Sequence, residues 1–302
     1  AKVEYIDSWQ LDSERRDFTI NAIYLDINGN IFDPQNGKSD LKNKIVKFIG
    51  DPQKRIEEDY LRIIRFIRFK IMYDFELEPT TCKAIKLNLN GIKKLSKERI
   101  LVELYKILNL KKFLNLNEST DLKEIFTLIF PEFKNLKRLD RLIKICDNSQ
   151  VSMNLLLAIL LIDDQDTHEY FGHKYNISNN IKDNLNSLAK NFKLMNKNKN
   201  FFNKDLEKNI YLKNKDYLIN LNILNFVINQ SVKLKDFSET LSKILKSKTH
   251  KFSIDGKFLI ENGMKQGSLI GKVLKEIENE WIKNDFKISR DRIKEIIQFH
   301  SN

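Results

Sequence analysis

The chain has 302 residues, of which 41% are hydrophobic and 31% charged, a composition typical of a folded protein rather than a disordered or fibrous one. Its longest apolar run, L-L-L-A-I-L-L-I at residues 155–162, is far shorter than the roughly 18 residues of a membrane-spanning helix, so we expect a cytoplasmic protein without a membrane partner. The net charge of +12 favours a polyanionic partner, because a basic surface gains affinity by releasing counterions from phosphates.

β structure is expected only near the start of the chain. The apolar segments 21–26 and 31–33 flank Asn28-Gly29, a dipeptide that favours a tight hairpin turn. A further short strand is expected at Ile45–Ile49. This part of the chain therefore predicts a small antiparallel sheet.

From Gln53 onward the apolar residues recur at intervals of three and four, as they do in helices. Four prolines and nine glycines in 302 residues favour an array of helices with short connections over a compact α/β fold. Ser96 stands in the N-cap position of one helix. The predicted helices are Gln53–Tyr73, Pro79–Asn88, Ser96–Asn109 and Leu122–Phe130. The expected fold class is α+β and mostly α.

The most informative predicted helix contains E-E-D-Y-L-R-I-I-R-F-I-R-F at residues 57–69. Tyr60 and the isoleucines that follow it fall on one stripe and are expected to face a core. Four charged residues are spaced by three, so each lies about 60° behind the last and together they wind over the opposite face. These four are Asp59, Arg62, Arg65 and Arg68.

A ligand that contacted all four charges would have to be extended, with an anionic end toward Arg65 and Arg68, and a nucleoside triphosphate has that shape. The alternative is a solvated face on which Glu58 and Asp59 offset the arginines. Leu61, Phe66 and Phe69 lie on the same face, which argues against simple solvation.

The positions of the arginines help to distinguish positive charge that serves a function from positive charge that reflects the overall composition. Only 11 of the 53 basic residues are arginine, in a chain rich in lysine, asparagine and isoleucine, and five of these are Arg15, Arg16, Arg62, Arg65 and Arg68. Where composition favours lysine, these positions are expected to need a guanidinium group. Because Arg15 and Arg16 are adjacent on a segment expected to be extended, we predict that they point to opposite faces, with Arg15 structural.

Residues 180–217 are rich in lysine and asparagine, with aromatic residues between them. An RNA-binding surface that stacks bases is one interpretation, and a solvated helical face with its aromatic side chains in the core is the favoured one. The aromatic residues are Phe192, Phe201, Phe202 and Tyr211. Cys82 and Cys146 have no partner at metal-site spacing and are expected to be free thiols.

With these motifs identified, the chain resembles the class II tRNA nucleotidyltransferases, the family of bacterial CCA-adding enzymes and bacterial poly(A) polymerases. The family pattern R-R-D-F-T-x-N-A is matched by residues 15–22 without a change. D-P-x-G-G-x-x-D-L appears at residues 33–41 with Asn36 in place of the first glycine. E-D-x-x-R is residues 58–62, and S-x-E-R-I-x-x-E-L is residues 96–104.

The resemblance implies roles for the charged residues. Asp59 and Arg62 would act as a protein template for the incoming base, and Arg16, Arg65 and Arg68 would hold the nucleotide, chiefly its phosphates. A carboxylate only accepts hydrogen bonds and a guanidinium only donates them, which suits the amine and adjacent ring nitrogen that cytosine and adenine share. Asp17 and Asn21 are further candidates, for the ribose.

The resemblance also implies a metal-binding segment that this sequence does not contain. Relatives carry, before R-R-D, a D-x-D strand whose aspartates bind Mg²⁺, and this sequence has neither that strand nor a catalytic carboxylate at that place. The nearest match in spacing, Asp164-Gln165-Asp166, is expected to be a loop. Since the chain begins at Ala1 without an initiator Met, we expect it to start inside a domain, with the metal ligands outside it and supplied, in one interpretation, by a separate chain.

The resemblance implies the remnant of a nucleotidyltransferase sheet in a head, followed by an elongated helical neck, body and tail. The expected domains are residues 1–52, the end of the head; 53–115, the nucleotide-selecting neck; and 116–302, the body and tail that hold tRNA. The expected activity is addition of CMP and AMP to the tRNA 3′ end, with ATP, CTP and Mg²⁺. A poly(A) polymerase of the same family and a non-catalytic RNA-binding fragment are the alternatives.

Overall fold

The structure, a computed structural model, describes residues 8–76, 78–146 and 151–301. By packing the chain divides into two compact units, Ala1–Lys190 with Val227–Gln230, and Asn191–Phe226 with Ser231–Asn302. These units describe packing, and the functional domains expected at 1–52, 53–115 and 116–302 stay a prediction. Among the described residues, no helix is both long and apolar enough to cross a bilayer.

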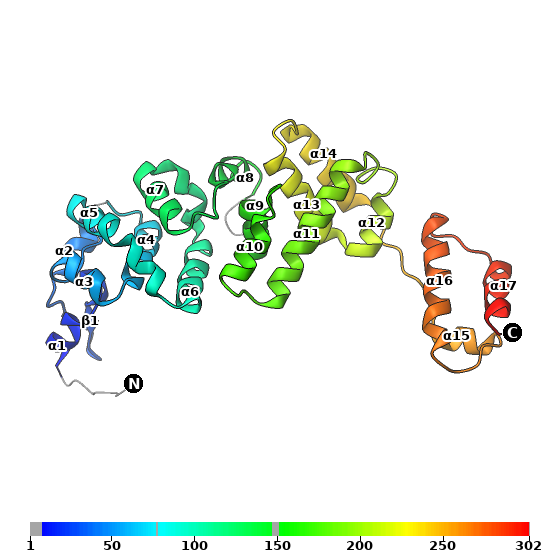
Figure 1. Cartoon of the computed structure of the whole chain (residues 1–302), viewed down its shortest axis with the longest axis horizontal. Coiled ribbons are helices and arrows are strands. Elements are labelled where there is room, and N and C mark those ends of the chain that lie inside the picture. The colour runs from blue at the N-terminus through cyan, green and yellow to red at the C-terminus, as the bar shows by residue number, and fades with distance from the viewer. Residues whose placement is uncertain (1–7, 77, 147–150, 302) are drawn as a thin grey trace. The chain divides into compact units, whose positions relative to one another are not determined.

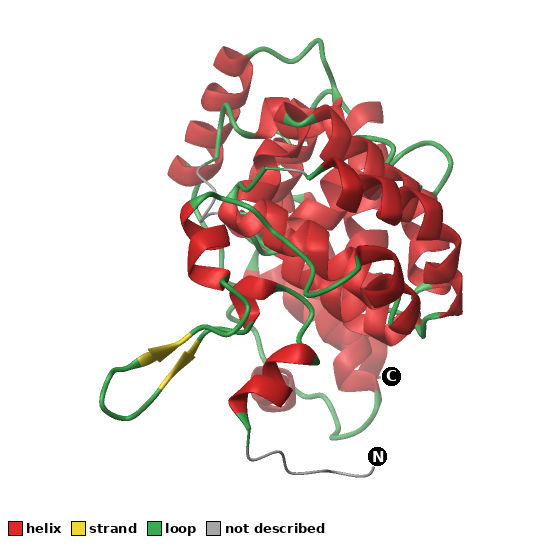
Figure 2. Ribbon diagram, turned by 90° about the vertical axis from the view of Figure 1, so that its left-hand side faces the viewer, coloured by secondary structure: helices red, strands yellow, loops and turns green. Residues whose placement is uncertain are grey.

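Helices make up most of both units (Figures 1 and 2). In the first unit the elements up to the neck are α1 (Trp9–Glu14), the 3₁₀ turn η1 (Thr19–Asn21), β1 (Tyr24–Leu25), β2 (Ile31–Phe32), α2 (Gly37–Lys42), α3 (Pro52–Glu58), α4 (Leu61–Tyr73), α5 (Pro79–Asn88), η2 (Leu89–Lys94) and α6 (Lys97–Leu108). They are followed by η3 (Lys111–Glu118), α7 (Thr120–Ile129), η4 (Leu136–Arg138), α8 (Leu139–Leu142), α9 (Met153–Leu161), α10 (Thr167–Lys174), α11 (Asn179–Lys197), α12 (Leu206–Lys213), α13 (Lys215–Ile228), α14 (Leu234–Lys246), α15 (Gly256–Glu261), α16 (Leu269–Lys283) and α17 (Arg290–Ser301).

The predicted fold class, mostly helical with a small antiparallel sheet, is confirmed. β1 pairs with β2 in antiparallel fashion, with Tyr24 opposite Phe32, and the hairpin projects from the helices in Figure 2. Its turn is closed by the Asp26 carboxylate, which accepts the backbone N–H of Asn28 at 2.8 Å. Gly29 adopts a φ of +85°, a conformation that glycine reaches without strain.

Two details of the predicted sheet are wrong. Residues 19–21 form the 3₁₀ turn η1, so the first strand starts only at Tyr24. The segment 45–49 is no strand of the sheet, because it makes only isolated bridges, Phe18 to Phe48 and Ile45 to Glu76. Its apolar residues are buried as single contacts rather than paired along a ladder.

The helix predicted from Gln53 to Tyr73 is in fact two helices. α3 ends at Glu58, Asp59 is extended with φ −153° and ψ 103°, and α4 begins at Leu61. The Asp59 carboxylate accepts the backbone N–H of Leu61 at 3.1 Å, which satisfies one of the unpaired donors at the start of the new helix. Apolar periodicity continues across the break, so periodicity alone could not reveal it.

α4 is the central helix of this region and is buried on most sides. The predicted core stripe is confirmed, since Ile63, Ile64 and Ile67 are fully buried. Phe66 and Phe69, on the face that carries the arginines, are buried as well. The Phe66 ring stacks on Phe48, and the Phe69 ring packs edge-on against Phe18. The arginines of α4 therefore lie in a packed environment rather than on a solvated face.

The shorter predicted helices occur where expected. α5 spans Pro79–Asn88 as predicted, and the Ser96 hydroxyl accepts the backbone N–H of Arg99 as the N-cap of α6. α6 packs along α4, which brings the neck motif at residues 96–104 against the arginine helix.

The motif at residues 33–41 closes onto the segment that carries R-R-D-F-T. The Asp33 carboxylate caps α2 by accepting the backbone N–H of Gly37 at 2.7 Å. A Cβ on Gly37 would lie 2.2 Å from the Thr19 carbonyl oxygen, and the Thr19 hydroxyl donates to Asp40 at 2.7 Å. Asn36, which replaces a family glycine, has a φ of 56°, a conformation that asparagine tolerates.

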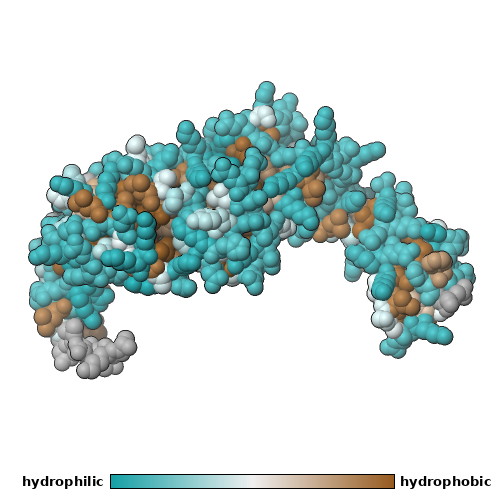
Figure 3. All heavy atoms as spheres, viewed as in Figure 1, coloured by the Kyte–Doolittle hydropathy of each residue, from teal (hydrophilic) through white to brown (hydrophobic). Residues whose placement is uncertain are grey.

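In the second unit, aromatic residues of the lysine- and asparagine-rich segment are buried rather than exposed for stacking. Phe192 and Phe201 are less than a tenth exposed. The Tyr211 hydroxyl bonds Glu278, and its ring packs edge-on against Trp281. The favoured interpretation of a helical face with its aromatic side chains inside is confirmed for Phe192 and Phe201, whereas Phe202 and Tyr211 are half-buried. The surface is mainly hydrophilic on the face that Figure 3 shows.

Candidate functional site

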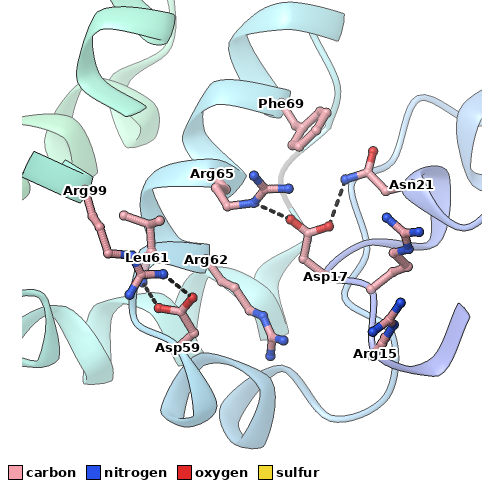
Figure 4. Close-up of a pocket in the computed structure, with 10 residues that line it drawn as sticks. Arg15, Asp17, Asn21, Asp59, Leu61, Arg62, Arg65, Phe69 and Arg99 are labelled. Atoms are coloured by element: carbon pink, nitrogen blue, oxygen red, sulfur yellow. Dashed lines mark hydrogen bonds and ion pairs between the residues drawn. The ribbon is translucent and has the colours of Figure 1, made fainter. Parts of the chain in front are cut away.

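A cavity of about 490 Å³ opens in the first unit, between the end of α1, the start of α4 and the first turn of α6. Figure 4 shows Arg65 and Asn21 pointing toward Asp17, and Arg99 pointing toward Asp59. The lining residues are Arg15, Arg16, Asp17, Asn21, Asp59, Leu61, Arg62, Arg65, Phe69 and Arg99. The cavity therefore joins three of the four sequence motifs.

Positive charge dominates this lining. Five of the chain's 11 arginines line the cavity, against two aspartates. A cluster of guanidinium groups with few compensating carboxylates attracts anions, and the fork of each guanidinium suits phosphate oxygens. The concentration of arginine here agrees with the expectation drawn from its scarcity elsewhere.

Asp59 is held by a residue that sequence reasoning did not assign. The Arg99 guanidinium, from the first turn of α6, donates to Oδ2 of Asp59 at 2.7 Å, while Oδ1 accepts the Leu61 N–H. The carboxylate is thus fixed from two sides at the mouth of the cavity. Each of its oxygens has a second lone pair available for a ligand.

Arg62 is held by two residues of the preceding helix, α3. Its Nη1 donates to the Arg55 carbonyl oxygen at 2.7 Å and to Glu58 at 2.6 Å. Arg55 in turn donates to the carbonyl oxygen of Arg16. The Nε and Nη2 groups of Arg62 carry its three remaining N–H donors.

Arg15 and Arg16 contact the same carboxylate, so the prediction that they point to opposite faces is wrong. α1 ends at Glu14, and its C-cap Arg15 has a φ of −86° and a ψ of −9°, which are helical rather than extended. Both side chains pair with Asp12, Arg15 through Nε at 2.6 Å and Arg16 through Nη2 at 2.6 Å. Hydrogen bonds from Arg16, Tyr24 and Arg15 lower the pKa of Asp12 to about 2.

Asp17 and Asn21 meet at the inner wall, next to Arg65. The Asp17 carboxylate accepts from Arg65 Nε at 2.6 Å and from the Asn21 side chain at 2.8 Å. Burial alone would raise the pKa of Asp17, but the hydrogen bonds from Arg65 and Asn21 outweigh it and lower the pKa. Asp17 therefore fixes Arg65 so that its guanidinium faces the cavity.

Arg68 is placed differently from the other predicted arginines. Its Nε donates to Oε2 of Glu103 at 2.8 Å, and its guanidinium lies over the Phe69 ring, 4.4 Å from the centroid. It is not among the described residues that line the cavity, and it supports Arg65 through the shared carboxylate of Glu103.

Sequence reasoning missed Asp12, Arg99 and Glu103 as parts of this site. Arg99 and Glu103 are four residues apart in the neck motif, on one face of α6, and that spacing was an available signal. Asp12 precedes the arginines by three and four residues, a spacing that pairs side chains only once the segment is recognised as helical.

The described residues do not fit a magnesium site. Asp17 is engaged by Arg65 and Asp59 by Arg99, so the carboxylates of the cavity are neutralised by guanidinium groups. Among the residues that the structure describes, no group of three or more His, Cys, Asp and Glu side chains is placed to hold a metal ion. Asp164 to Asp166 form the turn between α9 and α10, as predicted.

Two family profiles match the chain. Residues 1–47 match the profile described as "Poly A polymerase head domain". Residues 74–137 match "Probable RNA and SrmB- binding site of polymerase A". The first profile covers the R-R-D-F-T and Asp33–Leu41 motifs and the second covers the neck motif of α6.

Curated relatives match nearly the whole chain. The CCA-adding enzyme of Lactobacillus helveticus (strain DPC 4571) is 29% identical over 304 residues, covering 98% of this chain and 73% of the relative. The mitochondrial CCA tRNA nucleotidyltransferase 1 of Homo sapiens is 30% identical over 303 residues, covering 97% of this chain and 67% of the relative.

Solved structures share the fold at lower identity. The CCA-adding enzyme of Bacillus stearothermophilus in complex with CTP superposes with a TM-score of 0.70 at 21% identity, over 98% of this chain and 75% of that one. The Thermotoga maritima CCA-adding enzyme complexed with tRNA-CCA gives a TM-score of 0.55 at 21% identity, over 97% and 74%. Because the human relative is 30% identical over 97% of this chain and two thirds of its own length, and both profiles agree, the chain belongs to the family of CCA-adding tRNA nucleotidyltransferases and bacterial poly(A) polymerases.

Proposed function

We propose that this chain selects the nucleotide and holds the RNA in a CCA tRNA nucleotidyltransferase, which adds CMP and AMP to the tRNA 3′ end. The observation that carries the proposal is the meeting of Asp59 and Arg62 with Arg16 and Arg65 in one cavity. The side chains that would recognise a base and those that would hold phosphates come from different motifs and line the same space.

Base selection follows from the hydrogen-bonding character of Asp59 and Arg62. A carboxylate accepts from the exocyclic amine of cytosine or adenine, and a guanidinium donates to the adjacent ring nitrogen. Uracil and guanine present a carbonyl where the amine should be, so the carboxylate would face an acceptor and remain unpaired. Arg99 holds the Asp59 carboxylate, and the Arg55 carbonyl oxygen holds the Arg62 guanidinium. Both Asp59 and Arg62 keep hydrogen-bonding capacity for a base.

The triphosphate would lie along the arginines deeper in the cavity. Arg65 is fixed by Asp17 and Arg16 by Asp12, so both guanidinium groups are oriented before the ligand arrives. Such pre-orientation lowers the entropy lost on binding. Arg68 would contribute through Glu103, which it shares with Arg65.

Mg²⁺ belongs to the proposed reaction, and its ligands would come from outside the described residues. A metal ion there would activate the RNA 3′-hydroxyl and stabilise the leaving pyrophosphate. The residues described here would bind and orient the nucleotide and the RNA, and we assign them no metal.

An incorporation assay tests the proposal. The chain is incubated with tRNA lacking its terminus, Mg²⁺ and labelled CTP or ATP, with and without a polypeptide that supplies D-x-D. Addition of CMP and then AMP supports the proposal. Long runs of AMP alone would indicate a poly(A) polymerase, and tRNA binding without incorporation under every condition would indicate a non-catalytic RNA-binding protein.

Equilibrium binding tests the residue assignments without turnover. Removing the guanidinium in Arg62→Ala deletes a charged hydrogen bond of about 1.5 to 3 kcal/mol, so CTP should bind roughly ten- to a hundredfold more weakly. Arg290→Ala, an exposed arginine outside the cavity, is the matched control. Equal CTP affinity in Arg62→Ala and the control would contradict the assignment.

A further inference from the structure

A second cavity of about 490 Å³ lies in the first unit, away from the nucleotide site, and it is basic throughout. It is formed by α7, the turn η4, the start of α8 and the end of α13. Its lining residues are Lys123, Thr127, Phe133, Lys134, Asn135, Leu136, Lys137, Arg138, Arg141, Val227, Ile228 and Gln230.

The charge of this lining sets it apart from the other described cavities. It contains five cationic side chains and no carboxylate. The nucleotide cavity includes two aspartates, and the cavity beside α12 includes Asp205, Glu207 and Asp285. A hollow lined by five cations and no acidic residue favours anions, although Asp163 and Asp164 act on Arg138 electrostatically from outside the lining.

One of the cations is built into the fold. Arg138 donates from Nη1 to the carbonyl oxygens of Ile159 at 2.7 Å and Ile162 at 2.8 Å, at the end of α9. A single nitrogen makes both bonds, so Nε and Nη2 of the guanidinium keep their donors. Asp163, which acts on Arg138 electrostatically, is itself engaged by Thr167 through the hydroxyl at 2.7 Å.

The rim of the cavity differs from its floor. Lys134 and Lys137 are exposed, whereas Phe133 and Leu136 between and beside them are buried. The half-buried guanidinium of Arg138 is fixed by backbone carbonyl oxygens, whereas the ammonium groups of Lys134 and Lys137 are exposed. An anion with several phosphates along its length could contact the guanidinium and both ammonium groups.

We infer that this cavity binds the phosphodiester backbone of the RNA substrate, with Arg138 holding one phosphate and Lys134 and Lys137 contacting its neighbours. A volume of about 490 Å³ accommodates a nucleotide unit, within the usual range for ligand cavities. The inference rests on the proposed RNA substrate and adds an anchoring site distinct from the nucleotide cavity. Phosphate contacts of this kind position an RNA without reading its sequence.

The test measures RNA binding rather than catalysis, so it is independent of incorporation. The full chain and its Lys134→Ala/Lys137→Ala variant are titrated with tRNA lacking its terminal CCA, at several salt concentrations. Each lost phosphate contact should lower the slope of log affinity against log salt by about one. Between 1 M and 0.1 M salt such a slope corresponds to about eightfold per contact, so the double variant should bind roughly sixtyfold more weakly at 0.1 M.

A second double variant, Lys42→Ala/Lys47→Ala, controls for net charge, because neither lysine lies in a segment linked to RNA binding. Both of these lysines are exposed and lie outside the described cavities of the first unit. A loss of tRNA affinity in the cavity variant that equals the loss in the control would overturn the inference, because general electrostatics would then explain it.

Titration with CMP and with inorganic phosphate separates RNA from a free anion. We expect the cavity variant to bind both as the unmodified chain does. If it loses CMP or phosphate binding but keeps its tRNA affinity and salt slope, the cavity takes a free anion and the RNA assignment is wrong. Unchanged tRNA affinity and salt slope in the cavity variant would overturn this inference. Absence of incorporation by the unmodified chain under every condition would instead overturn the proposed function.

Discussion

Replacing Glu103 by glutamine tests the ion-pair network that joins α4 to α6. The Glu103 side chain is 4% exposed and accepts from Arg68 Nε at 2.8 Å and from Lys106 Nζ at 2.8 Å, with Arg65 at 3.8 Å. Glutamine keeps the shape and one acceptor oxygen but removes the charge. Glu103→Gln would therefore leave guanidinium charge near α6 without its counterion.

The magnitude follows from the exposure of each partner. The Arg68 side chain is 15% exposed, so its bond is worth about 1.5 to 3 kcal/mol, as for other charged hydrogen bonds. Lys106 is half exposed, so its pair contributes only about 0 to 1 kcal/mol. We expect Glu103→Gln to destabilise the fold by about 3 kcal/mol in total, below the upper range for breaking fully buried pairs.

The assay is urea unfolding of the full chain, followed by circular dichroism. Glu124→Gln is the control, because Glu124 pairs with Lys86 at 2.9 Å but both side chains are nearly half exposed. The control should change the free energy of unfolding by less than about 1 kcal/mol. If the two variants are equally stable, Glu103 does not stabilise this region through its charge, and our account of how Arg65 and Arg68 are supported fails.

Three further substitutions test other contacts. Arg99→Ala frees the Asp59 carboxylate, and the loss of one charged hydrogen bond of about 1.5 kcal/mol should weaken CTP binding roughly tenfold, measured by calorimetric titration. Asp12→Asn removes a group whose pKa is lowered to about 2, so the stability that it contributes above about pH 4 and that is lost as the pH falls toward 2 should disappear from the pH profile of unfolding. Gly37→Ala forces a Cβ against the Thr19 carbonyl and should cost about 1 to 3 kcal/mol in urea unfolding.

Each of these has a contrasting variant. Arg99→Lys keeps the charge and should recover part of the CTP affinity, whereas no recovery would indicate that the guanidinium fork is what matters. Gly267→Ala should be neutral, since a Cβ there meets nothing within 4 Å. The account of Asp12 is wrong if Asp12→Asn and the unmodified chain lose stability in parallel between pH 4 and pH 2.

The local elements of this fold were predictable because their signals are local. Pro79 begins α5 and Ser96 caps α6, where a proline and a serine are favoured, and Asn28-Gly29 makes the hairpin turn. The break at Asp59 was not predicted, because no proline or glycine marks it and the apolar pattern runs through. Its only local sign is an aspartate, which also occurs inside helices.

The site was predictable only as far as its motifs were contiguous. Asp59, Arg62 and Arg65 were placed together by spacing along one segment, and the structure brings them to one cavity. Arg99 lies 40 residues from Asp59, and Asp17 lies 48 residues from Arg65, so these pairs depend on how α6 and the first segment pack against α4. Such pairings are properties of the tertiary fold and leave no periodic trace in the sequence.

Two hydrogen bonds of the site run from a side chain to the main chain, from Arg62 to the Arg55 carbonyl and from Arg55 to the Arg16 carbonyl. Each depends on the side chain of the donor and not on that of the acceptor residue. A main-chain acceptor is present whichever side chain stands there, so substitution can act only on the donor. For these two bonds, homologous sequences would accordingly show a retained arginine donor with a variable acceptor residue, whereas Glu58, which accepts from both arginines through its side chain, would vary together with them. In a chain with 42 lysines and 11 arginines, drift toward lysine would be resisted at the donors, because an ammonium group lacks the fork that spans two acceptors.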